Sequence, residues 1–286
     1  MTEMPTPIPL RERTIDALPW LVTAAMTLAT FALAFGPDWS SLPARVLMLI
    51  GFVAISAHLL RGRGRQFFNG PVAYAAAGSL LLLVVLALFA NEIAPQNPYD
   101  LANLSLMDSR RPPGFVGSGG YTHLLGTDPQ GRDLLSAIFY GLRISIQIGL
   151  AAGFVSLTIG TALGITAAYV GGRIEALIMR LVDLQLSFPA ILLALVIVAL
   201  LGQGKTQLIG ALVAAQYAYF ARTAYGAAKA ERGKDYIEAA LATPLSGRLV
   251  VWRHLLPNCT PPLIVVATVQ IANSISLEAT LSFLGL

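Results

Sequence analysis

Residues 144–170 read ISIQIGLAAGFVSLTIGTALGITAAYV, without a single Asp, Glu, Lys or Arg. A helix needs roughly 20 mostly apolar residues to cross the hydrocarbon core of a bilayer. Inside lipid the backbone must satisfy its own hydrogen bonds, and a single chain segment does this as a helix. The run therefore predicts a membrane-spanning helix.

Similar apolar runs recur on both sides of this one. The whole chain is 56% hydrophobic and only 12% charged, whereas soluble domains carry about 25% charged residues. A soluble chain this apolar would expose large patches and aggregate. The sequence thus predicts an all-α, polytopic bundle and excludes a soluble globular enzyme. The further predicted spans are 18–35, 44–60, 72–90, 184–201, 262–283 and, weaker because tyrosines and Arg222 interrupt it, 207–228.

Basic residues gather in alternate loops. Cytosolic loops of membrane proteins carry an excess of Lys and Arg, and the bias is consistent when the N-terminus is placed in the cytosol. This orientation predicts a multi-pass protein of the bacterial cytoplasmic membrane with a long outer segment, 91–142, and a long cytosolic loop, 230–257. The basic residues then on the cytosolic side are Arg11, Arg13, Arg61, Arg63, Arg65, Arg173, Arg180, Lys229, Arg232, Lys234, Arg248 and Arg253.

The residues for covalent, metal or nucleotide chemistry are sparse. The single cysteine, Cys259, allows no internal disulfide, and the histidines at 58, 123 and 254 lack paired metal-ligand spacing. LGQGKT at 201–206 imitates the tail of a phosphate-binding loop, but it lies between two predicted spans instead of between a strand and a helix. We therefore expect no catalytic, cofactor or metal site, and no ATPase of its own.

The cytosolic loop holds the most informative pattern, KDYIEAALATPLSGRLVVWRHLLP at 234–257. Apolar residues from Tyr236 to Leu241 recur at helical spacing. Thr243 followed by Pro244 is a helix-start signature, and proline also stops the preceding helix. The pattern predicts helix, break and helix. Such a surface either docks into a groove on another protein or lies on the bilayer surface.

The run EAA at 238–240, followed by LLP at 255–257, resembles the EAA loop of permease subunits in ATP-binding-cassette (ABC) importers. That resemblance implies a coupling helix that fits a cleft in an ATPase subunit. Pro244 stands where the family usually has glycine, which leaves the turn geometry open. The resemblance assigns ATPase coupling to Tyr236, Glu238, Ala239, Ala240, Pro244, Gly247, Leu256 and Pro257.

Three further blocks, 124–145, 167–195 and 277–286, are similar to the dipeptide/oligopeptide/nickel branch of these permeases, and to the second of its two paired subunits. The domain organisation expected from this is an extension with two spans at 1–71, a first core helix plus outer segment at 72–142, and a permease core at 143–286. The family usually continues beyond the block that ends at Leu286, so its last helix is expected to be absent.

The resemblance implies a type I permease fold that moves di- or oligopeptides, or related small solutes, inward. The implied partners are a second permease, two ATPase subunits that hold ATP and Mg²⁺, an extracytoplasmic solute-binding protein and the bilayer, without nucleic acid. Dipeptide, oligopeptide, glutathione and nickel-chelate importers share these blocks, so the substrate stays open. The alternatives are an ion-gradient transporter, a membrane scaffold subunit and a membrane-embedded enzyme.

Two acidic residues lie in or near predicted spans. Asp183 follows Arg180 by three residues, which favours an ion pair within one helix over a role in the translocation pathway. Glu278 lies in an apolar stretch, and a carboxylate in lipid is expensive unless it is paired or hydrated. It is expected to face the central cavity or the paired subunit, or to be exposed at the outer interface.

Two motifs suggest packing and turn roles. GxxxG matches at 149–153 and 160–164 predict a face that packs closely on another helix, either within the chain or in the second permease. Asp128, Arg132 and Asp133 belong to a GTD–GRD block that predicts a tight turn with local ion pairs or, alternatively, a contact with the solute-binding protein.

Overall fold

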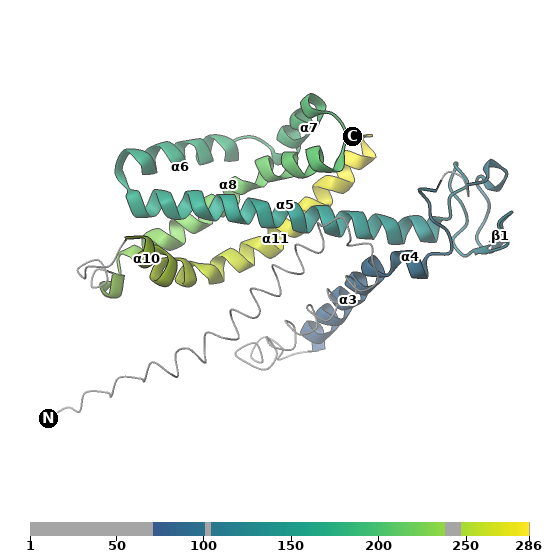
Figure 1. Ribbon diagram of the computed structural model, residues 1–286, viewed down its shortest axis with the longest axis horizontal. Coiled ribbons are helices and arrows are strands. Elements are labelled where there is room, and N and C mark those ends of the chain that lie inside the picture. Colours follow the sequence, from purple (N-terminus) through teal and green to yellow (C-terminus); the bar gives the residue numbers. More distant parts are fainter. Residues whose placement is uncertain (1–70, 101–103, 238–246, 286) are drawn as a thin grey trace. The chain divides into compact units, whose positions relative to one another are not determined.

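The computed structural model describes residues 71–100, 104–237 and 247–285. Within them the chain is mostly helical, as expected from its composition (Figure 1). It divides into two compact units, Met1–Arg143 and Ile144–Leu286. The two predicted spans at 18–35 and 44–60 lie outside the described residues.

The first unit contains an apolar helix followed by a small folded segment. Helix α3, Pro71–Leu88, is long and apolar enough to cross a membrane, which confirms the predicted span at 72–90. The segment after it holds α4, Ala90–Ile93, the 3₁₀ turn η3, Leu106–Asp108, and a two-stranded antiparallel hairpin. The hairpin pairs β1, Phe115–Val116, with β2, Thr122–His123; two-residue strands leave little alternation to find in a sequence.

Helix α5 runs from Leu134 to Val170, 37 residues without a break. It begins where the carboxylate of Asp133 accepts a hydrogen bond from the backbone N–H of Ser136, 2.7 Å away, which is the capping arrangement that favours a helix start. The predicted span at 144–170 is thus the later part of a longer helix that begins in the segment before it. At 1.5 Å per residue the helix is about 55 Å long, more than the roughly 30 Å hydrocarbon core.

The predicted straight span at 184–201 is wrong. Helix α6, Gly172–Leu186, ends there, and α7, Ala190–Leu201, begins after Pro189 at an angle of 91° to it. Proline disfavours a helical conformation in the residue before it and lacks the N–H that a continuous helix needs. Hydropathy alone did not register that break, because the residues on both sides of it are apolar.

Helices α8, Lys205–Arg232, and α11, Leu256–Phe283, complete the second unit. A four-residue helix, α10, Gly247–Val250, and a π-helical turn, η4, Val251–Leu255, lead into α11. The last span therefore begins before the predicted residue 262, and Pro261 and Pro262 lie inside α11. Neighbouring helices and local adjustments let membrane helices tolerate such prolines.

Of the described helices, α3, α5 and the η4–α11 helix are long and apolar enough to span a membrane, and the bent pair α6 and α7 is a fourth candidate. Helix α8 is long enough to span a membrane but is not apolar enough. Arg222 and its tyrosines, which weakened the prediction at 207–228, account for this. It nevertheless packs against α6, α7 and α11, so protein replaces lipid over much of its surface.

The glycine motifs of α5 pack within the chain. A Cβ at Gly160 would collide with the carbonyl oxygen of Tyr217, and a Cβ at Gly164 with that of Ala221. The other pair faces α11, where a Cβ at Gly153 would lie 2.6 Å from Cγ1 of Ile271. The predicted close-packing face is confirmed, and both partners are helices of this chain.

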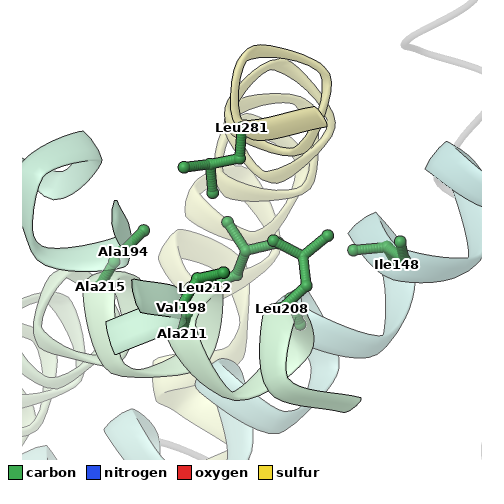
Figure 2. Packing of buried hydrophobic residues seen from close by; sticks show 9 residues of the cluster. Ile148, Ala194, Val198, Leu208, Ala211, Leu212, Ala215 and Leu281 are labelled. Carbon is green, nitrogen blue, oxygen red and sulfur yellow. The ribbon is translucent and has the colours of Figure 1, made fainter. Parts of the chain in front are cut away.

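A hydrophobic cluster joins α5, α7, α8 and α11 at one end of the second unit (Figure 2). Leu281 of α11 points toward Leu212 of α8, and Ala194 and Val198 of α7 pack on the same side chains. Small residues on α7 and α8 let the two helices approach closely. The bend after Leu186 thus positions α7 across the end of α8.

Candidate functional site

The two ends of the predicted coupling loop are joined to α8 and α11 by hydrogen bonds. The hydroxyl of Tyr236 donates to Glu231 at the end of α8, 2.6 Å away, and accepts a hydrogen bond from Asn258 of α11, 3.0 Å away. Lys234 forms an ion pair with the same Glu231. Desolvation of the phenol and its bond to Glu231 raise the pKa of Tyr236 to about 12, so this hydroxyl stays protonated and able to donate.

Apolar contacts hold the same two ends together. Ile237 and Val250, which lie on either side of residues 238–246, are both buried and form one cluster. Gly247 approaches the ring of Tyr169 so closely that a Cβ there would collide with the hydroxyl. Leu256 packs against the cluster of α5, α8 and α11 side chains that includes Leu255, and Pro257 occupies the first turn of α11.

Glu238, Ala239, Ala240 and Pro244 lie outside the described residues. Their assignment to ATPase coupling therefore stays a prediction. The structure instead defines the frame that carries them, which is closed at both ends by Tyr236 and by the Ile237–Val250 contact.

The helix ends around this frame are joined by a polar network that sequence reasoning missed. Glu175 of α6 accepts hydrogen bonds from Tyr225, 2.5 Å away, and Lys229, 2.6 Å away, both of α8. Arg232 donates to the backbone carbonyl of Ala168 near the end of α5, 2.8 Å away. Nothing local in the sequence pairs these positions, because 54 residues separate Glu175 from Lys229.

Asp183 does not pair with Arg180, contrary to the expectation from their spacing. Its carboxylate binds the guanidinium of Arg222 on α8, while Arg180 makes no hydrogen bond or ion pair within the described part of the chain. Both partners of the Asp183–Arg222 pair remain 50% exposed. The interhelical partner was not predictable without knowing that α6 packs on α8.

Glu278 is buried, with 6% of its surface exposed, so the alternative of simple exposure at an interface is wrong. Its two carboxylate oxygens accept hydrogen bonds from Ser145 of α5, 2.7 Å away, and Ser282 of α11, 3.1 Å away. The residue thus joins α5 to α11 inside the second unit.

The GTD–GRD block of the first unit forms the predicted tight turn. Asp128 binds the side chain of Arg132, 2.7 Å away, and accepts backbone hydrogen bonds from Gln130 and Arg132. Burial alone would raise the pKa of Asp128, but these hydrogen bonds outweigh it and lower the pKa. Asp128 and Arg132 both keep part of their side chains accessible.

Asp133 is fully buried, so it cannot make the contact with a binding protein that the sequence suggested for it. One carboxylate oxygen, Oδ2, binds Ser136, and the other, Oδ1, lies 3.0 Å from Nδ1 of the buried His123. The backbone N–H of Asp133 donates to Gln96. Nearby, hydrogen bonds from Ser118 hold the pKa of Asp108 below its usual range. The folded segment after α3 is thus organised around buried carboxylates.

Residues 160–286 match the family described as "Binding-protein-dependent transport system inner membrane component". Over 207 residues the chain is 38% identical to the di/tripeptide transport system permease protein DppC of Pseudomonas aeruginosa, covering 72% of this chain and 67% of the relative. It is 34% identical to the dipeptide permease DppC of Haemophilus influenzae, covering 72% and 69%. The glutathione transport system permease protein GsiD of Pectobacterium atrosepticum is 35% identical over 225 residues, covering 78% and 71%.

Proposed function

This chain belongs to the binding-protein-dependent transport system inner membrane components, as the DppC-like permease of a peptide-type ABC importer, and from that premise we propose that it carries short peptides inward across the cytoplasmic membrane. Membership of this family favours an importer permease over the alternatives of an ion-gradient carrier, a scaffold subunit and a membrane enzyme. The substrate class rests on the relatives, whose names specify dipeptides, tripeptides or glutathione.

We further propose that residues 230–257 transmit ATPase movement to the helices. The observation that carries this is the bonding of Tyr236 to Glu231 on one side and to Asn258 on the other. Because one phenol links the ends of α8 and α11, a displacement of the loop moves both helices together. The loop would lie on the cytosolic side, docked against one of two ATPase subunits, with ATP and Mg²⁺ bound there and not on this chain.

The outer segment is proposed to receive peptide from a solute-binding protein, and a second permease to complete the pathway. The accessible Asp128–Arg132 pair, held rigidly by the turn around it, is the charged surface available for that contact. A pre-organised ion pair presents its charges without further loss of side-chain entropy.

The coupling role is tested by reversing the charge of Glu238 in the complete complex. Glu238→Arg is expected to abolish co-purification of the ATPase subunits and peptide uptake, with an unchanged amount of permease in the membrane. Arg173→Glu is the matched control, a charge reversal at the exposed start of α6, and should retain the ATPase. Normal assembly and uptake with Glu238→Arg would refute the coupling proposal.

A further inference from the structure

The surface between α6 and α8 contains charge where lipid cannot be the neighbour. Arg222 and Asp183 are each half exposed, yet Arg222 lies ten residues before the end of α8 and Asp183 eleven residues after the start of α6. At 1.5 Å per residue both are about 15 Å along their helices from the shared helix ends, and Asp183 lies within the bent α6–α7 pair that is a candidate span. The Glu175–Lys229 ion pair, 2.6 Å long, shows that these two helix ends are adjacent.

Ionised side chains within membrane spans face a protein partner or a water-filled cavity, and they mark substrate pathways. Two hollows occupy this surface. One of about 250 Å³ lies between the helices, with Glu175 and Met179 on one wall and Arg222 and Tyr225 on the other. The second, about 460 Å³, follows α6 past Arg180 and Asp183 to Ser187. Ala176 and Met179 line both, so the two hollows adjoin along α6.

The charged groups of this surface are incompletely paired. Within the described part of the chain, the Asp183–Arg222 pair uses only Oδ1 and Nη2, and Arg180 has no partner at all. A guanidinium carries five N–H donors and cannot lose its charge. Two arginines and one aspartate therefore offer binding capacity for an anion and, beside it, for a cation.

The exposed stripe of α8 fits a ligand with a peptide backbone. Tyr219, Arg222, Gly226 and Lys229 are exposed and follow one another along one face of α8, and a Cβ at Gly226 would meet nothing within 4 Å. Tyrosine and arginine together supply a flat apolar surface and donors for a carboxylate. The larger hollow, about 460 Å³, falls within the roughly 300–1,000 Å³ of small-molecule sites.

We propose that this surface, defined by Arg180 and Asp183 of α6 and Tyr219 and Arg222 of α8, is a binding site for a short zwitterionic peptide in the translocation pathway. The peptide carboxylate binds Arg180 and Arg222, and its terminal ammonium binds the free oxygen of Asp183. The inference rests on the proposed import of peptides and specifies where this chain contacts them.

The first test measures uptake of radiolabelled dialanine by proteoliposomes that contain the complete importer. Losing a charge-assisted hydrogen bond corresponds to a reduction of roughly 10- to 100-fold, so Asp183→Asn and Arg222→Gln are expected to reduce uptake by that factor. The control Arg173→Gln, on an exposed residue at the start of α6, should match wild type. If the wild type takes up dialanine and the Asp183 and Arg222 variants do so equally well, the site is overturned but the importer is not. If the wild type takes up no dialanine, the proposed function is overturned.

The second test separates ligand contact from a structural role of the ion pair. In a Cys259→Ala background, which removes the only cysteine, Tyr219→Cys is treated with a charged methanethiosulfonate in the assembled complex. The matched control is Ile264→Cys on α11, whose native side chain is 54% exposed, compared with 39% for Tyr219. The site is supported if position 219 is labelled, if excess dialanine slows that labelling severalfold, and if position 264 is not labelled. No labelling at 219, equal labelling at both positions, or no protection by dialanine refutes it.

Discussion

Helix α8 has two sides of opposite character. Toward α5, Gly160 and Gly164 bring backbone against backbone, with no room for even a methyl group. Toward α6, buried apolar side chains of the two helices also pack together, but beside them lies a hollow of about 250 Å³ that charged side chains bridge. The first side has one well-defined arrangement, because packed interfaces do not deform continuously. The second has space for a ligand and bonds that can be exchanged, so movement and binding belong there.

The largest effect is expected from filling the tight side. In Gly164→Leu the new side chain would meet the carbonyl oxygen of Ala221, the Cβ of Ala224 and the backbone nitrogen of Tyr225. Two of these are backbone atoms, which cannot rotate away, so we expect a loss of about 3 kcal/mol or more, at the upper end of overpacking effects. The amount of monodisperse protein after detergent extraction and the midpoint of SDS-induced unfolding measure this.

Gly226→Leu is the matched control, because it makes the same chemical change on α8, where no atom lies within 4 Å. Removing a helix-interior glycine should by itself stabilise the helix by up to about 1 kcal/mol. If Gly164→Leu and Gly226→Leu unfold at the same SDS concentration, the two sides of α8 do not differ in packing.

A smaller loss is expected where glycine meets a side chain. In Gly153→Ala the new methyl would lie 2.6 Å from Cγ1 of Ile271, but that side chain can change rotamer, so we expect a loss of about 1–2 kcal/mol. The double variant with Ile271→Val should recover part of it. If the stability losses of Gly153→Ala and Ile271→Val, measured by SDS titration, simply add in the double variant, the two residues are not in direct contact.

Both glycine pairs could be predicted as close-packing positions from their spacing alone, since small residues four apart share one helix face. Their partners could not, because spacing within α5 carries no information on which helix lies opposite. The same limit applies to Asp183: its spacing favoured Arg180, but the contact is with Arg222, 39 residues away. Local periodicity therefore determined the helices, whereas charge pairing depended on tertiary packing.

The predicted coupling loop shows the reverse situation. The sequence predicted it through EAA at 238–240 and LLP at 255–257. That prediction rested more on resemblance to a known family than on helical periodicity. What physical reasoning lacked was the frame around it: Glu231, Asn258 and Glu175 had no pattern that set them apart from solvated polar residues. The bend before Pro189 was in contrast available from the sequence and was overlooked because apolar length outweighed the proline.

A hydrogen bond between α8 and α11 is expected to contribute an intermediate amount to the free energy of unfolding. Ser274 donates to Oε1 of the buried Gln216, 2.8 Å away, and Nε2 of the same amide has no partner within the described residues. Ser274→Ala removes the bond and is expected to lower the free energy of unfolding by about 1 kcal/mol. Ser276→Ala, an exposed position two residues on that bonds only its own helix, should change it far less. Equal effects at 274 and 276 would show that the α8–α11 contact is not held by this bond.

The smallest effect is expected on the open side, at Gln185. Its amide donates to the carbonyl of Ala214 across the α6–α8 contact, 2.8 Å away. That carbonyl lies inside α8 and already accepts a hydrogen bond from its own helix. Gln185→Leu therefore leaves no buried polar group without a hydrogen bond, and it adds apolar surface. We expect a change of less than about 0.5 kcal/mol in either direction, compared with about 1 kcal/mol at Ser274. A loss at Gln185 as large as that at Ser274 would mean that the α6 side is held as firmly as the others, and that α6 is not free to separate from α8 when a ligand enters.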